Sequence, residues 1–341
     1  MRLRIVAADR LMTPPARAVT TDLMVAAEIV FIGLSAVWCA LAWLYADPPD
    51  SGIMRRRRIA ASLAIVIPLA GLLLSTGIAA AVVLAVTLAW YLRLTPRNDH
   101  AWETEYMRAP GIGWDGNQAL VRNVRDFRYR SKSDPIPAWY DDRFDIETLT
   151  GVDLVCSYWT GPAIAHVFLS FGFADGRHLS VSVETRRRKG QTYSAIAGFF
   201  RHYQLIFVVA DERDLIGVRT DIRRERVYLY PLRITREETR RLFAGYMNRA
   251  AKLGEWPEFY NTLTNNCTSN IVRIIDRGLP RGQRLGASWR LLFSGYADAF
   301  AYDAGRLAGD GPFAELKRRS LIGRWPESKI SEDFSAAIRK A

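Results

Sequence analysis

The sequence is poor in the residues that usually crosslink an extracellular domain or hold a metal ion. Its 341 residues include three cysteines and four histidines. The cysteines, Cys39, Cys156 and Cys267, do not form a disulfide framework. One cysteine in a polar context, without histidines at ligand spacing, argues against a zinc site. We therefore expect no metal, no cofactor and a fold stabilised by an ordinary hydrophobic core.

The first 97 residues contain no lysine and only five acidic residues, against ten arginines. Leu23–Ala46 is apolar apart from Glu28 and is long enough to cross a hydrocarbon core of ~30 Å. A signal peptide fits less well, because the run is too long and a second run follows. That second run, Ile59–Leu92, has no charged residue, and as one helix it would measure about 50 Å. It predicts either one span with an extension or two short spans that turn near Ser75–Gly77.

We predict a membrane region over residues 1–97 with two spans, about 23–46 and 59–92, or three if the second run turns. Arg55–Arg58 lie between the two runs and should face the cytoplasm. With two spans, the N-terminus and the domain after Arg97 then lie outside the cytoplasm. The four arginines before residue 22 favour the opposite side for the N-terminus.

The net charge of +12 is spread along the chain, with short basic runs at Arg186–Lys189 and Arg223–Arg226. This pattern favours a solvated basic surface over a nucleic-acid site. A basic surface beside a membrane also suits anionic lipid. We therefore expect no nucleic-acid partner.

After Arg97 the composition is that of a globular protein, and we predict one α+β domain over residues 98–341 with its core at about 140–290. Asn98–Pro137 is polar and is interpreted as a loop-rich entry segment. Thr235, with Glu238 three residues on, predicts a capped helix over Arg236–Leu253. Short strands are predicted at Val152–Trp159, Ile164–Phe173, His178–Glu184, Leu205–Val209 and Arg226–Tyr230.

The loop Ala174–Gly176 predicts a hairpin between two half-buried strands, since a three-residue loop with Gly in the left-handed position is favoured. It sets a register in which paired residue numbers sum to 350, and this puts seven apolar residues on one face. The other face places His166 opposite Glu184, with Ser182 beside them. The carboxylate could hold one ring nitrogen as N–H and leave the other as a base. The alternative is a surface His–Glu pair of little energetic weight.

Polar, cap-forming residues surround Cys267 just before a helix predicted over Cys267–Arg277, which ends at Gly278. Asn265 or Asn266 is a natural N-cap. The first turn of a helix favours an anion, so it lowers the pKa of a thiol and increases the fraction of thiolate. A buried structural cysteine would instead lie among apolar neighbours, as Cys156 does in its predicted strand.

A cysteine at a helix start that faces a histidine on a strand is the geometry of papain-like thiol enzymes. In the usual papain order the cysteine precedes the histidine. Here His166 precedes Cys267, so a match requires the circularly permuted arrangement.

Four stretches, Ala165–Phe173, Ser182–Arg186, Ala210–Ile216 and Tyr260–Thr268, resemble the Lnb N-terminal periplasmic domain family of bacterial envelope proteins. The resemblance covers roughly Asn98 to Arg290. It implies a permuted papain-like, NlpC-type fold, similar also to the lecithin:retinol acyltransferase group. The family's Cys and His fall on Cys267 and His166.

The resemblance implies a thiol acyltransferase or hydrolase tethered to the bacterial inner membrane, with its main domain facing the periplasm. The name-giving members acylate lipoproteins at the N-terminus, so membrane lipid or a lipoprotein is the expected partner. In those members the membrane part follows the domain, whereas here it precedes it. The specific substrate therefore stays open.

We predict that the Cys267 thiolate attacks an ester or amide carbonyl, while His166, oriented by Glu184 or Ser182, moves the proton. Two alternatives remain, a papain-like cell-wall peptidase or amidase and a non-catalytic envelope domain that binds lipid or a partner. An Asn side chain and helix N–H groups could stabilise an oxyanion, and Arg186 could bind a phosphate or carboxylate. The predicted substrate-binding residues are Asn265, Asn266, Tyr260, Arg186 and Ser170.

Structural interpretations compete at several of these positions. For Asp211–Arg219 a salt-bridge network that joins strands is favoured over a binding role. For Arg186 the two interpretations are about equal. Tyr260 could line a cleft or pack as a core aromatic.

Overall fold

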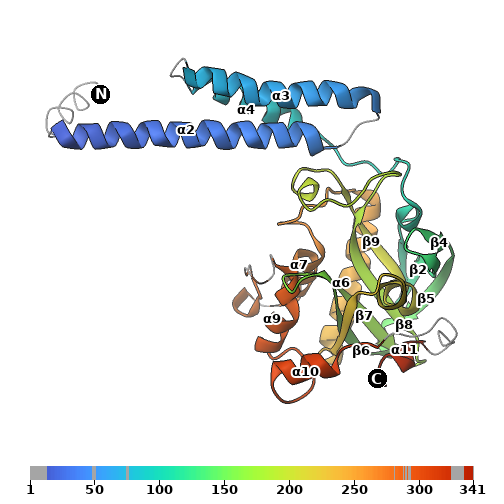
Figure 1. Ribbon diagram of the computed structural model, residues 1–341. Helices are drawn as coiled ribbons and strands as arrows, with labels where there is room; N and C mark the ends of the chain where they lie inside the picture. Colours follow the sequence, from blue (N-terminus) through green and yellow to red (C-terminus); the bar gives the residue numbers. More distant parts are fainter. Residues whose placement is uncertain are drawn as a thin grey trace. The chain divides into compact units, whose positions relative to one another are not determined.

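The computed structural model describes residues 14–47, 51–73, 77–279, 281–286, 288, 290, 293–323 and 334–340 (Figure 1). The chain forms two compact units. One consists of Met1–Thr95 with Phe200–His202, and the other of Pro96–Phe199 with Tyr203–Ala341.

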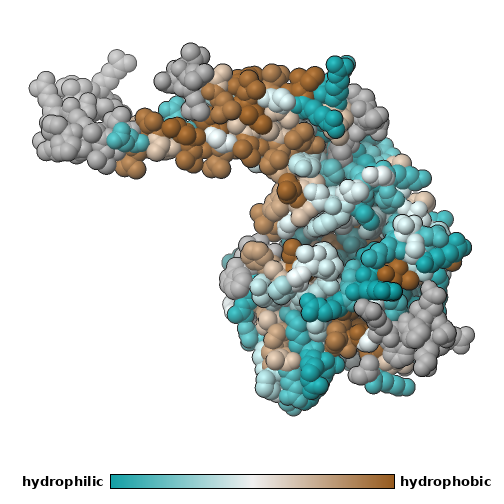
Figure 2. Space-filling view, viewed as in Figure 1, coloured by the Kyte–Doolittle hydropathy of each residue, from teal (hydrophilic) through white to brown (hydrophobic). Residues whose placement is uncertain are grey.

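The N-terminal unit contains three helices, α2 (Pro14–Tyr45), α3 (Ser51–Leu73) and α4 (Ile78–Leu92). Within α2, Asp22–Tyr45 is long and apolar enough to cross a membrane by length and composition. Trp43 stacks on Trp90 with ring centroids 4.0 Å apart, which joins α2 to α4. Hydrophobic residues cover much of the visible surface of these helices (Figure 2). Such a surface is that of a lipid-facing segment.

The second apolar run is not one helix of about 50 Å. It is divided between α3 and α4, and Gly77 lies in the turn between them, while Ser75 and Thr76 lie outside the described residues. The 15 residues of α4 span about 22 Å, which is less than a hydrocarbon core of ~30 Å. The number of spans stays a prediction.

The second unit is built on an eight-stranded sheet in the order β1-β2-β9-β8-β7-β6-β10, with β5 paired to β2. Every pair is antiparallel except β2 with β9. The unit is thus of mixed α+β class with a mostly antiparallel sheet, as predicted. The strands are β1 (Gly111–Asp115), β2 (Gln118–Arg125), β5 (Trp139–Asp145), β6 (Leu149–Thr160), β7 (Ile164–Phe173), β8 (His178–Arg186), β9 (Gln204–Asp211) and β10 (Arg226–Pro231).

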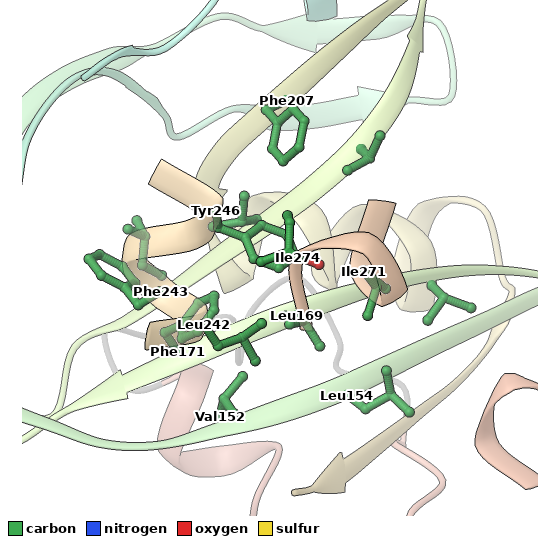
Figure 3. Close-up of a cluster of buried hydrophobic side chains, with 14 of the residues drawn as sticks. Val152, Leu154, Leu169, Phe171, Phe207, Leu242, Phe243, Tyr246, Ile271 and Ile274 are labelled. Carbon is green, nitrogen blue, oxygen red and sulfur yellow. The ribbon is translucent and has the colours of Figure 1, made fainter. Parts of the chain in front are cut away.

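One face of the sheet is covered by α6 (Arg236–Glu255), α7 (Cys267–Arg277) and α9 (Ala297–Asp303). Figure 3 shows how side chains of α6 and α7 meet those of the strands in this core. Gly245 allows α6 and α7 to approach closely, because a Cβ there would lie 2.7 Å from Ile274. The predicted capping box of Thr235 and Glu238 is confirmed at the start of α6.

The opposite face is also buried, which corrects the prediction of half-buried strands. It is covered by α5 (Glu212–Leu215), a π-helical turn η4 (Val218–Ile222) and α11 (Phe334–Ala337). Serines on this face are fully buried and are satisfied by hydrogen bonds. Polar alternation along a strand therefore did not mean exposure, because polar partners from the second layer replace water.

The entry segment before Pro137 is not loop-rich, and this prediction was wrong. It contains β1, β2 and a two-stranded sheet of β3 (Arg128–Ser131) and β4 (Asp134–Ile136). Ala119, Val121 and Val124 alternate inward from β2 into the core. Three apolar residues among charged ones were too weak a period-two signal to predict a strand.

The remaining elements are short and connect or flank the sheet. Strands β6 to β10 and helices α6 and α7 confirm the predicted elements within a few residues at their ends. The short elements are η1 (Thr104–Tyr106), η2 (Ile146–Thr148), η3 (Ala197–Phe199), η5 (Arg281–Gln283), η6 (Ser294–Tyr296) and α10 (Phe313–Arg319).

Candidate active site

Cys267 is the first residue of α7, where its thiol is 9% exposed. The side chain of Asn266 caps the helix by accepting a hydrogen bond of 2.8 Å from the Ser269 amide. Ser269 Oγ in turn accepts one of 2.8 Å from the Asn266 amide. This reciprocal box fixes the start of the helix one residue before the cysteine. The prediction of a cysteine in the first helical turn is confirmed.

The thiol of Cys267 is in hydrogen-bonding contact with the side chain of His166 and with the backbone of Val167. Burial raises the pKa of this thiol, but the hydrogen bond and charge of His166, with the Val167 backbone, outweigh that effect. The pKa therefore lies below the ordinary value of 9.0. This environment favours the thiolate, which is the nucleophilic form of cysteine.

His166 lies on β7 and uses Nε2 to contact two residues of β8. The ring nitrogen is 2.6 Å from Ser182 Oγ and 3.0 Å from Glu184 Oε1. Burial lowers the pKa of His166, but the charge of Glu184 opposes burial and raises the pKa to about 9. The imidazole is therefore held largely as imidazolium at neutral pH.

Glu184 connects the histidine to a buried arginine. Its Oε1 accepts hydrogen bonds from Ser182 Oγ at 2.8 Å and from Arg219 Nη2 at 2.9 Å. Burial raises the pKa of Glu184, but the charge and hydrogen bond of His166, with the charge of Arg219, hold it well below 4.5. Cys267, His166, Glu184 and Arg219 thus form a row in which acidic and basic groups alternate. The buried charges compensate one another along this row.

The hairpin register brings the histidine and the carboxylate together. Four backbone pairs, from Leu169 with Val181 to Gly172 with His178, follow the predicted sum of 350. The ladder stops at Leu169, so the predicted pair of His166 with Glu184 lies beyond it, and the contact is made by the side chains alone. From this point on, β7 and β8 are not joined by backbone pairs, and α7 contacts both strands.

The two asparagines before Cys267 hold the preceding loop. Asn266 Nδ2 donates to the Thr262 carbonyl at 2.6 Å, besides capping α7. Asn265 Nδ2 donates to the Phe259 carbonyl at 2.9 Å, and its Oδ1 accepts from Asn270 at 3.0 Å. The structure gives both side chains positioning contacts, and their predicted contact with substrate stays a prediction.

Arg186 and Ser170 are engaged elsewhere. The Arg186 guanidinium donates to the Tyr106 carbonyl at 3.1 Å and to Asn98 Oδ1 at 2.8 Å, which fastens the entry segment to β8. Ser170 is fully buried and donates to Glu212 Oε1 at 2.6 Å. Four residues of strand separate Ser170 from His166 by about 13 Å. The structure therefore does not join Ser170 to the thiol.

Tyrosines surround the thiol on the side away from His166 and Glu184 in sequence. Burial raises the pKa of Tyr260 well above its ordinary value, and the charge of Cys267 adds to this effect. Burial and then the charge of Cys267 also raise the pKa of Tyr193. Tyr260 packs against the main core, while the side chain of Tyr193 is 48% exposed. Both lie close enough to Cys267 to shape access to it.

Sequence reasoning undervalued Arg219 and missed Tyr193. Arg219 was assigned to a structural network, and for its neighbours this is confirmed, because Asp214 is fully buried and binds Arg125 through both oxygens at 2.7 and 2.8 Å. Arg219 instead reaches Glu184. Tyr193 lies in a loop without periodicity, so no sequence signal marked it.

The arrangement can deliver a nucleophile and a proton to one point. A thiolate-favouring cysteine at a helix start beside an imidazolium is able to attack a carbonyl and protonate a leaving group. Within the described residues, no cluster of three or more His, Cys, Asp or Glu side chains could hold a metal ion.

The fold and the site define a mixed α+β domain in which a thiol at a helix start meets an imidazole carried by the sheet. Residues 136–295, which include this site, match the model of the family described as the Lnb N-terminal periplasmic domain. The predicted resemblance is confirmed, and this part of the chain belongs to that periplasmic family. No curated protein and no solved structure matches the chain. With the apolar helix α2, the match favours a membrane-anchored periplasmic protein.

Proposed function

We propose that the protein is a thiol acyltransferase anchored in the bacterial inner membrane, acting on membrane lipid or a lipoprotein in the periplasm. The observation that carries this proposal is the contact of the Cys267 thiol with His166, whose other partner is the buried carboxylate of Glu184. This combination produces a reactive thiol, and a general acid lies beside it.

In the proposed reaction the Cys267 thiolate attacks an ester carbonyl carbon. A C–S bond forms, the ester C–O bond breaks, and the leaving alkoxide takes the proton of the His166 imidazolium. An amine of the acceptor then attacks the thioester, transfers its proton to His166 and releases the thiolate. Backbone N–H groups in the first turn of α7 would stabilise the oxyanion of both tetrahedral intermediates.

The proposal includes a circularly permuted papain-like core for the domain after residue 97. A histidine on a strand, a carboxylate on the next strand and a later cysteine at a helix start support this architecture. The membrane region over residues 1–97 would keep the thiol close to lipid, and α2 is the helix best suited to span the bilayer.

The test is to detect the acyl-enzyme on the full-length protein. The protein in membrane vesicles is given a phospholipid with an alkyne-tagged acyl chain, then probed for a hydroxylamine-sensitive tag. We expect the tag on Cys267 and none in Cys267→Ser. Cys156→Ala is the matched control and should keep full labelling, because that thiol is fully buried in β6.

Two outcomes would redirect the proposal. Cleavage of cell-wall peptides that depends on Cys267, without any lipid-derived tag, would identify a peptidase or amidase. Unchanged cellular function in Cys267→Ser would identify a non-catalytic envelope domain.

A further inference from the structure

The helical face of the sheet contains a groove that the catalytic proposal does not use. The groove has a volume of about 590 Å³ and lies among α6, α7 and α9 over β6 and β7. Its walls are mainly apolar, with Leu242 from α6, Ile271 and Ile275 from α7 and Phe300 from α9. Its size and lining are typical of a site for an apolar ligand.

One end of the groove adjoins Cys267. Val167 and Thr268 line it, and Val167 also makes the backbone hydrogen bond to the Cys267 thiol. The lining continues along α7 to Leu279, about 16 Å from Thr268 at ~1.5 Å per residue. A linear chain lying in the groove would therefore have one end beside the sulfur.

The charged residues of the groove are mainly basic. Arg241, Lys252 and Arg277 line it and are exposed, and Glu238 is the acidic residue among the described lining residues. Glu238 is paired with Arg306 at 3.3 Å. An apolar floor with a basic margin complements an apolar chain that ends in an anionic group.

We propose that this groove binds one acyl chain of an anionic membrane phospholipid, with the head group at the basic margin and the ester beside Cys267. The chain also carries an apolar helix long enough to cross a bilayer, so its domain has phospholipid within reach. That the bound lipid is the acyl donor rests on the proposed function, whereas binding in the groove does not.

The test uses the full-length protein carrying Cys267→Ala in vesicles, so that binding is measured without chemistry. The probe is phosphatidylglycerol with a photoreactive diazirine in its acyl chain. We expect crosslinks to concentrate on residues of α6, α7 and α9 that line the groove. Crosslinks distributed over the domain surface, or confined to the N-terminal helices, would overturn the proposal.

A matched pair of substitutions makes the result specific. Ala304 is exposed and lines the groove, and Ala174 is exposed in the hairpin loop away from it. Ala304→Trp should reduce groove crosslinking by roughly tenfold, equivalent to ~1.4 kcal/mol of lost binding. Ala174→Trp should leave it unchanged. Equal crosslinking in the two variants would overturn the proposal.

Head-group and catalytic arms separate the remaining possibilities. Phosphatidylcholine with the same chain should crosslink less, and Lys252→Gln with Arg277→Gln should remove the preference for the anionic lipid. Equal crosslinking by the two lipids would contradict the anionic head group. If crosslinks persist in the groove while wild-type Cys267 is never acylated, the proposed function fails and the lipid site stands. If cell-wall peptide displaces the probe and no lipid is retained, the lipid occupant is wrong.

Discussion

Cys156 and Cys267 are two buried, free thiols of one domain, and their surroundings push them in opposite directions. Cys156 lies in the middle of β6 with no exposed surface, and burial raises its pKa well above 9.0. Cys267 is 9% exposed at a helix start, and there His166 outweighs burial and lowers the pKa. The comparison shows that burial alone makes a thiol inert, and that a charged partner reverses its effect.

The strongest way to break this difference is to remove the cation that ends the charge row. Arg219→Met leaves the buried Glu184 carboxylate without one of its two cations, so we expect a loss of about 3 kcal/mol in the free energy of unfolding. Chemical denaturation would measure this loss. Arg318→Met, at an exposed position of α10, is the control and should change stability by less than ~0.5 kcal/mol. Equal stability of the two variants would contradict a structural role for the Arg219–Glu184 pair.

Removing the imidazole should make Cys267 resemble Cys156. In His166→Ala the thiol loses the hydrogen bond and charge that lower its pKa, so alkylation at pH 7 should slow by about tenfold or more. The rate of iodoacetamide labelling at Cys267, followed by mass spectrometry, measures this. The rate–pH curve should move to higher pH, since a raised pKa postpones formation of the thiolate. Unchanged labelling would show that the helix start alone activates the sulfur.

Glu184→Gln sharpens the comparison by testing the charge on the imidazole. The carboxylate raises the pKa of His166 to about 9, so its replacement by a neutral amide should return the pKa toward 6.5. The imidazolium would then be lost as pH rises at a lower pH than in the wild type. NMR titration can follow this directly, because the chain has four histidines. A pKa of His166 that stays near 9 would assign the shift to another group.

The smallest effect is expected at the helix cap. Asn266→Ala removes the side chain that accepts from the Ser269 amide, which should cost about 1 kcal/mol of stability. Asn266→Asp keeps an acceptor at that position and should retain most of the stability. Thermal unfolding of both variants measures the difference. If Asn266→Asp is as unstable as Asn266→Ala, capping is not what the residue contributes.

Local patterns predicted the parts of the fold whose causes are close in sequence. The three-residue loop at Ala174–Gly176 and the period of two fixed the register that Leu169 and Val181 follow. Polar residues before Ile271 predicted the start of α7 at Cys267. The entry segment failed because its inward residues are few, and their burial depends on strands far along the chain.

The sequence by itself determined that a cysteine begins a helix and that a histidine and a glutamate lie on neighbouring strands, because capping and alternation act over a few residues. Only the tertiary structure decided that the polar face of the hairpin is buried and that Arg219 meets Glu184 across 35 residues of chain. It also decided that a groove runs from Cys267 along α7. Contacts between distant segments depend on how layers pack, and no local pattern encodes that packing.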